Sequence, residues 1–90
     1  DSKYLAMLYA SGVNRLSLGV QSFNDDILRR LGRIHTGSEA KKAILTAKNL
    51  GFANISLDLM YGLPGQSLQA LKNSVATAIA LKPEQVFLTQ

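Results

Sequence analysis

The sequence contains no cysteine and no tryptophan, and its 90 residues include two prolines and one histidine. Without cysteine, the chain forms no disulfide and offers no thiolate to hold a metal, and cysteine usage says nothing about the redox compartment. No apolar run reaches transmembrane length, and the start Asp1-Ser2-Lys3 does not open a signal peptide. We therefore expect no membrane span.

Charged residues are also few, at 18%, and no block of one sign occurs although the formal net charge is +4. Arginines gather near the end of one predicted helix, and Lys41, Lys42 and Lys48 lie on another. This scatter is typical of a solvated surface, with nucleic-acid binding as the weaker alternative, so we expect no nucleic-acid partner. A hydrophobic content of 47% in 90 residues indicates one small globular domain.

Helical and strand patterns alternate along the chain. Apolar residues at helical spacing predict helices over residues 3–10 and after the caps Asn24, Thr36 and Ser67, with Ser38 as a competing cap for the third helix. Period-two alternation predicts strands over residues 15–20, 55–60 and 86–89. Glycines 12, 32 and 51 suit helix ends, and Pro83 marks the end of the last helix.

The central stretch is the strand over residues 55–60, which runs into a tight turn. Its apolar positions alternate with Ser56, Asp58 and Met60, so Asp58 lies near the carboxyl end on the face that is not apolar. Pro64-Gly65 suits a type II turn. Ligands of α/β folds bind at this end of the strands, which makes Asp58 a candidate site residue, whereas a structural acid is the alternative.

Strands that alternate with helices predict an α/β fold with parallel strands and flanking helices. Two strands carry one apolar face and one face of small or polar residues, which favours part of a barrel over a doubly wound sheet. A closed eight-stranded barrel takes about 200 residues or more, so we interpret residues 1–90 as a single segment of a larger barrel domain. Its polar face and open edges predict self-association of the isolated segment.

Three motifs resemble one family. They are Gly19-Val20-Gln21-Ser22-Phe23, Leu31-Gly32-Arg33-Ile34-His35 and Asp58-Leu59-Met60-Tyr61-Gly62-Leu63-Pro64-Gly65-Gln66. The chain is similar to the radical S-adenosylmethionine (SAM) family of oxygen-independent coproporphyrinogen III oxidases and their heme-chaperone branch. The resemblance implies a partial (β/α)6 TIM-like barrel, of which this segment would supply the last three strands.

The resemblance also implies site residues. Gln21 matches a glutamine that contacts SAM, Arg33 an arginine that binds its methionine end, and Asp58 an aspartate that hydrogen-bonds to it. A guanidinium suits a carboxylate because it offers a fork of donors, and an ionised carboxylate accepts from hydroxyls or an ammonium group. From the residues alone, Gln21 could instead cap a loop and Arg33 could be a solvated helix-end cation.

The same resemblance limits what this segment can do. The family's three cluster cysteines would lie upstream, so the parent protein would use SAM and a [4Fe–4S] cluster while this segment would bind neither alone and would be inactive. We assign no catalytic residue and no metal ligand here. His35 is expected to form a loop hydrogen bond, with heme ligation as the speculative alternative.

Two functions follow for the parent. One is oxidative decarboxylation of coproporphyrinogen III to protoporphyrinogen IX in heme biosynthesis. The other is a heme chaperone that delivers heme without oxidase activity, which Ser22 and the run Leu31-Gly32-Arg33-Ile34-His35 favour. Either would be cytoplasmic, with a porphyrinogen or heme as its partner. A phosphate-binding barrel is a weaker third reading, because no strand ends in a Gly-rich loop that opens a helix.

Overall fold

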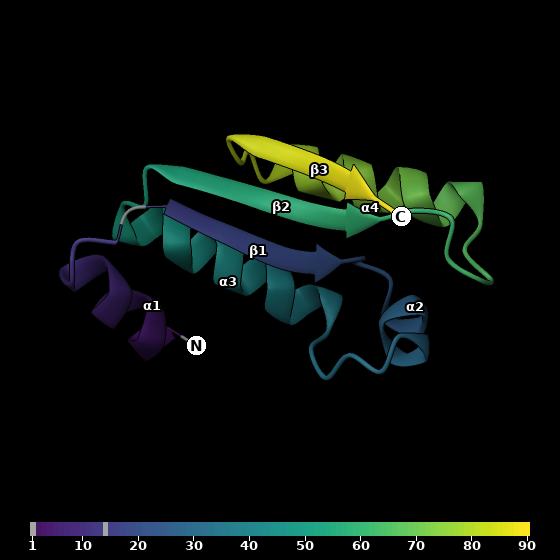
Figure 1. Cartoon of the computed structure of the whole chain (residues 1–90), viewed down its shortest axis with the longest axis horizontal. Coiled ribbons are helices and arrows are strands. Elements are labelled where there is room, and N and C mark those ends of the chain that lie inside the picture. Colours follow the sequence, from purple (N-terminus) through teal and green to yellow (C-terminus); the bar gives the residue numbers. More distant parts are fainter. Residues whose placement is uncertain (1, 14) are drawn as a thin grey trace.

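The structure is a computed structural model that describes residues 2–13 and 15–90, and the described residues form an alternation of helices and strands (Figure 1). Every predicted element is present, with bounds that differ from the expected ones by a few residues. In chain order the elements are α1 (Ser2–Ala10), β1 (Arg15–Gln21), α2 (Asp25–Arg30), α3 (Gly37–Leu50), β2 (Asn54–Met60), α4 (Leu68–Ala80) and β3 (Gln85–Thr89).

The three strands form one parallel sheet in the order β1-β2-β3. Gly19, Asp58 and Phe87 occupy the same row across the sheet. Because the strands are parallel, their carboxyl ends lie together, and α2 sits beside this edge (Figure 1). The predicted α/β fold with parallel strands and flanking helices is confirmed.

Helices α3 and α4 cover one face of the sheet. Ile55, Leu57 and Leu59 of β2 are at most 1% exposed and pack in one cluster with Ile44 of α3 and Ala78 of α4. Burial of each such aliphatic side chain contributes about 1.5–3 kcal/mol, so this layer is a large stabilising contribution. The alternate residues of β2 point to the other face, where Ser56 and Asp58 are half-buried.

The helix starts follow the predicted caps. Thr36 accepts from Glu39 N and the Glu39 side chain accepts from Thr36 N, which completes a capping box, while Ser38 is exposed within α3. The Asn24 and Ser67 side chains accept from Ile27 N and Ala70 N respectively. These local bonds fix where α2, α3 and α4 begin, and therefore where the loops that precede them must pass.

A lysine joins the two helices that cover the sheet. Lys48 Nζ of α3 donates to Leu81 O at 3.0 Å and to Lys82 O at 2.6 Å, just after α4 ends. Its ammonium group satisfies carbonyls that the helix end leaves without partners. Lys48 therefore ties α3 to the carboxyl end of α4 rather than serving only as a solvated charge.

Nothing among residues 2–13 and 15–90 covers the second face of the sheet with a helix, and β1 and β3 each leave one edge unpaired there. No helix of the described part is long and apolar enough to cross a membrane. The polar face and the shared carboxyl edge are thus the surfaces on which to look for a ligand site.

Candidate functional site

The carboxyl end of β1 contains an unusual turn. The register with β2 slips between Gly19 and Gln21, and Gln21 has a φ of 71°. Ser22 N donates to Val20 O at 2.8 Å. A bond from residue i+2 to residue i around a positive φ near 75° is the rare form of γ-turn, which is strained for a residue with a side chain.

The side chains of Gln21 and Arg33 meet beside Gly19. A Cβ placed on Gly19 would lie 3.2 Å from Gln21 Nε2 and 3.8 Å from an Arg33 guanidinium nitrogen. The Arg33 guanidinium also donates to Gly19 O at 3.3 Å. The missing side chain of Gly19 is therefore what allows the amide and the guanidinium to share one place on the open face.

Asp58 lies directly across from this place. It is the register partner of Gly19 on β2 and points to the same open face. Its half-buried carboxylate has no hydrogen bond and no ion pair with any residue in the described part of the chain. The structure thus brings together all three predicted site residues, Gln21, Arg33 and Asp58, at the carboxyl edge of the sheet.

The predicted turn after β2 closes the same edge. Gln66 N donates to Leu63 O at 2.9 Å, and Gly65 has a φ of 77°, which are the hydrogen bond and the positive φ of a type II turn with Pro64 at its second position. The Gln66 side chain adds bonds to Leu63 N and Met60 O, each at 3.3 Å. The turn beyond Asp58 is therefore held by its own residues.

Two buried serines support the loop that follows Gln21, and their pairing was not predicted from the sequence. Ser22 and Ser74 are 0% and 3% exposed, and their hydroxyl oxygens lie 3.2 Å apart. Ser74 Oγ accepts from Phe23 N at 3.1 Å, and Ser22 Oγ accepts from Asn24 N at 3.0 Å. Isolated serines 52 positions apart carry no pattern that predicts contact.

A second contact that sequence reasoning missed joins the starts of α2 and α3. Gly37 N donates to Asp25 Oδ1 at 2.8 Å, and a Cβ on Gly37 would collide with the backbone of Phe23. Glycine is required there by close approach rather than by a positive φ. The loop that carries Arg33 and His35 is therefore anchored at its far end.

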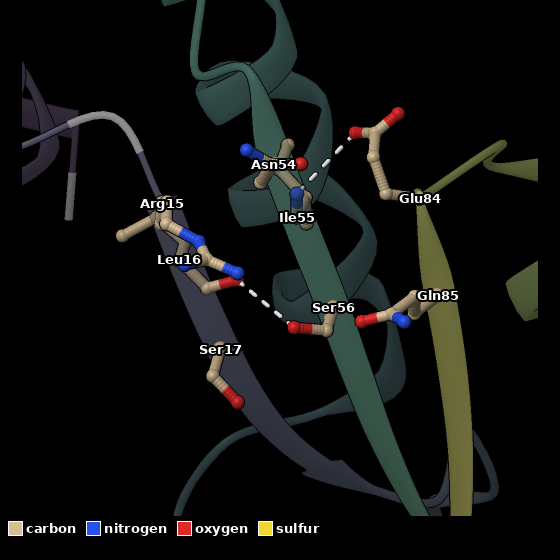
Figure 2. Close-up of a pocket in the computed structure, with 8 residues that line it drawn as sticks. All are labelled: Arg15, Leu16, Ser17, Asn54, Ile55, Ser56, Glu84 and Gln85. Carbon is tan, nitrogen blue, oxygen red and sulfur yellow. Dashed lines mark hydrogen bonds between the residues drawn. The ribbon is translucent and has the colours of Figure 1, made fainter.

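A cavity of about 510 Å³ lies at the opposite, amino end of the open face (Figure 2). Ser17, Ser56 and Gln85 stand in one row across its wall, and Glu84 accepts from Ile55 N at its rim. None of the three predicted site residues lines it. Ligands of parallel α/β sheets bind at the carboxyl ends of strands, so its size does not make it the candidate site.

The described residues contain no group of three or more side chains able to hold a metal ion, and the whole sequence has no cysteine. The donor and acceptor groups that are present suit an organic ligand with hydroxyl, carboxylate or ammonium groups. An amide, a guanidinium and a free carboxylate around a glycine backbone supply donors and acceptors for such groups.

Comparison with known proteins identifies the superfamily of the chain. The family model of the radical SAM superfamily matches residues 1–78. The chain belongs to the radical SAM superfamily. Its site residues fit SAM, which carries ribose hydroxyls, a carboxylate and an ammonium group.

Within the superfamily, the chain is similar to proteins of heme metabolism. It is 50% identical over 84 residues to the heme chaperone HemW of Bacillus subtilis and 52% identical over 73 residues to that of Escherichia coli. It is 35% identical over 86 residues to the oxygen-independent coproporphyrinogen III oxidase of Pseudomonas aeruginosa. These matches cover 93%, 81% and 96% of this chain but 22%, 19% and 19% of those proteins.

A solved structure supports the same relationship. The coproporphyrinogen III oxidase HemN from Escherichia coli, described as a radical SAM enzyme, superimposes with a TM-score of 0.90 at 30% sequence identity. The match covers 99% of this chain and 20% of that one. The chain thus has the fold of one part of a radical SAM domain and spans about a fifth of the relatives it matches.

Proposed function

We propose that this chain supplies the SAM-binding edge of a radical SAM barrel in a protein of heme metabolism, with Gln21, Arg33 and Asp58 as the ligand-binding residues. The main support for this proposal is the free carboxylate of Asp58. It lies across from Gly19, where the Gln21 amide and the Arg33 guanidinium also meet. A carboxylate without a protein partner keeps its acceptor positions available to a ligand.

Each side chain has a role that its chemistry supports. Arg33 offers a planar fork of donors to the carboxylate of the methionine end. Asp58 accepts from ribose hydroxyls or from the ammonium group, and the Gln21 amide both donates and accepts beside them. In this superfamily SAM supplies hydrogen abstraction after one-electron reduction by an iron–sulfur cluster, and cysteines outside this sequence would have to hold that cluster. The residues here bind and orient the ligand.

The activity of the whole protein has two candidates. Heme delivery by a chaperone is favoured by identities of 50% and 52% to HemW proteins, against 35% to a coproporphyrinogen III oxidase. Oxidative decarboxylation of coproporphyrinogen III is favoured by the superposition on HemN over 99% of the chain. Both use the same SAM edge, so the site assignment does not depend on the choice.

The site assignment is tested by SAM binding to the product of the complete reading frame that contains this chain, reconstituted anaerobically with iron and sulfide. Isothermal titration should give a dissociation constant that rises about tenfold or more in Asp58→Asn, because the amide no longer attracts an ammonium group or accepts as strongly. Asp26→Asn, at an exposed position of α2, is the matched control and should bind as wild type does. Equal affinity in all three proteins would refute the site.

The two activities are separated by product analysis. The reconstituted protein receives SAM, a reductant and coproporphyrinogen III, and mass spectrometry looks for the decarboxylated porphyrin. Product that disappears in Asp58→Asn supports the oxidase. No product from a protein that holds its cluster and binds SAM supports the chaperone, and transfer of bound heme to an apo-hemoprotein is then the decisive assay.

A further inference from the structure

We propose that Ser74 of α4 is a positioning residue that sets the conformation of Gln21 through the buried hydroxyl of Ser22. The inference rests on the proposed SAM site and adds a residue of α4 that determines the geometry of that site. Ser74 lies on α4, which covers the apolar face of the sheet, and its hydroxyl bonds to Ser22 and Phe23 rather than to a proposed site residue. Its effect on the site passes through the loop between β1 and α2.

The conformation of Gln21 needs external support. At a φ of 71° its Cβ crowds against the following carbonyl, which disfavours the conformation for any residue other than glycine. Strained backbone of this kind persists only where the surrounding structure holds it. The strand pairing gives only part of that support, because the register with β2 shifts between Gly19 and Gln21, directly before the pair Gln21–Leu59.

The serine pair provides that support at the next three residues. The hydroxyl of Ser22 lies 3.2 Å from that of Ser74, Phe23 N donates to Ser74 Oγ at 3.1 Å, and Asn24 N donates to Ser22 Oγ at 3.0 Å. Both hydroxyls are buried, so water does not replace a lost bond. The backbone that follows Gln21 is therefore fixed to α4. In this conformation the side-chain amide of Gln21 lies beside Gly19 and the Arg33 guanidinium.

SAM affinity depends on the fraction of molecules in which Gln21 has the binding conformation. If the loop is released, Gln21 relaxes toward ordinary backbone conformations and its amide leaves the site for part of the time. The apparent dissociation constant for SAM then rises in inverse proportion to the competent fraction. Ser74 should therefore affect SAM affinity although it does not touch SAM.

The experiment compares Ser74→Ala with two matched variants of the reconstituted product of the complete reading frame. Ser74→Thr keeps the hydroxyl, and a cavity of about 180 Å³ lined by Ser74, Phe23 and Thr77 leaves room for the added methyl group. Thr77→Val removes a hydroxyl from the same helix and the same cavity wall, but the Thr77 hydroxyl forms no hydrogen bond with the described residues of the loop.

Two readouts are taken on each protein. Hydrogen exchange followed by mass spectrometry reports on the peptide over residues 21–24, and isothermal titration reports the dissociation constant for SAM. In Ser74→Ala we expect exchange at least about tenfold faster and a dissociation constant about tenfold higher. Ser74→Thr and Thr77→Val should match wild type in both.

The outcomes separate this inference from the proposed function. Faster exchange in Ser74→Ala with unchanged SAM affinity overturns the positioning role and leaves the SAM site standing, and unchanged exchange overturns it as well. Equal loss of affinity in Thr77→Val shows a general effect of helix substitution and also overturns it. A wild-type protein that holds its cluster but binds no SAM refutes the proposed function, and the positioning role is refuted with it.

Discussion

The imidazole of His35 and the carbonyl of Val20 are joined by a hydrogen bond of 3.2 Å. A carbonyl oxygen only accepts, so His35 Nε2 carries the proton in this bond. The same oxygen accepts from Ser22 N at 2.8 Å, which closes the turn around Gln21. His35 therefore supports that turn from the α2–α3 loop, in agreement with the loop hydrogen bond expected from the sequence.

Substitution of His35 should separate this role from heme ligation. His35→Gln retains an N–H donor that can reach Val20 O, and we expect its SAM affinity to stay within about twofold of wild type. His35→Ala should weaken SAM binding about fivefold, because the partly buried hydrogen bond to Val20 O is lost. Titration calorimetry measures both. If His35→Gln binds SAM normally but loses heme in an absorbance titration, heme ligation is the correct role instead.

Gln21→Gly should lower SAM affinity while changing the free energy of unfolding only slightly. Glycine adopts the positive φ without crowding, while its greater freedom in the unfolded chain opposes this gain, so the free energy of unfolding should change by less than about 1 kcal/mol. SAM affinity should fall because the amide is gone. Urea unfolding and titration calorimetry test the two statements, and a loss of more than about 2 kcal/mol would show that the Gln21 side chain is structural.

Gly19→Ala probes the space that the site residues share. The new methyl group would lie 3.2 Å from Gln21 Nε2, tighter than ordinary contact, so the amide should move and SAM should bind several-fold more weakly. Ser17→Ala, two residues earlier on the same exposed face, is the control. The prediction fails if both variants bind SAM as wild type does, or if both lose affinity equally.

Gly37→Ala tests the contact at the start of α3. Its Cβ would collide with the Phe23 backbone, and overpacking of this kind costs about 1–3 kcal/mol of unfolding free energy. Ser38→Ala, at the next and exposed position of the same helix, should cost less than about 0.5 kcal/mol. Chemical denaturation measures both, and equal stability of the two variants would mean that the loop shifts freely.

The 90-residue chain should associate when it is prepared alone. Its polar sheet face carries no helix within the described residues, and β1 and β3 each expose an edge with unpaired backbone groups. Sedimentation velocity over a range of concentrations should show dimers or larger species. A single species at 9.7 kDa would contradict this expectation.

The fold was predictable because local patterns and global packing agree. Ile55, Leu57 and Leu59 alternate in the sequence as they do in the sheet, and the caps at Thr36 and Ser67 act within three residues of themselves. These signals depend on short separations, and a single sequence records them. Gln21 and Arg33 were assigned from motif resemblance, and Asp58 was assigned both from that resemblance and from its place near the carboxyl end of its strand. The structure adds that the three residues share one edge.

The contacts that support the site were not predictable, because they join residues that lie far apart in the sequence. The register shift between Gly19 and Gln21 contradicts the simple alternation of β1. No residue type marks the positive φ of Gln21, because glycine would be the usual choice there. The Ser22–Ser74 bond and the contact of Gly37 with Phe23 depend on how the elements dock. Such contacts appear only once three-dimensional packing is known.

The 52-residue separation between Ser22 and Ser74 also has a consequence for synthesis of the protein. Chains fold progressively from the amino end as they are made. Residues 15–35 emerge early, but the hydroxyl that holds the Gln21 turn belongs to a helix that the ribosome adds much later. The nascent chain therefore cannot give the site its final shape until α4 has emerged and packed, so the site is among the last parts of this region to mature.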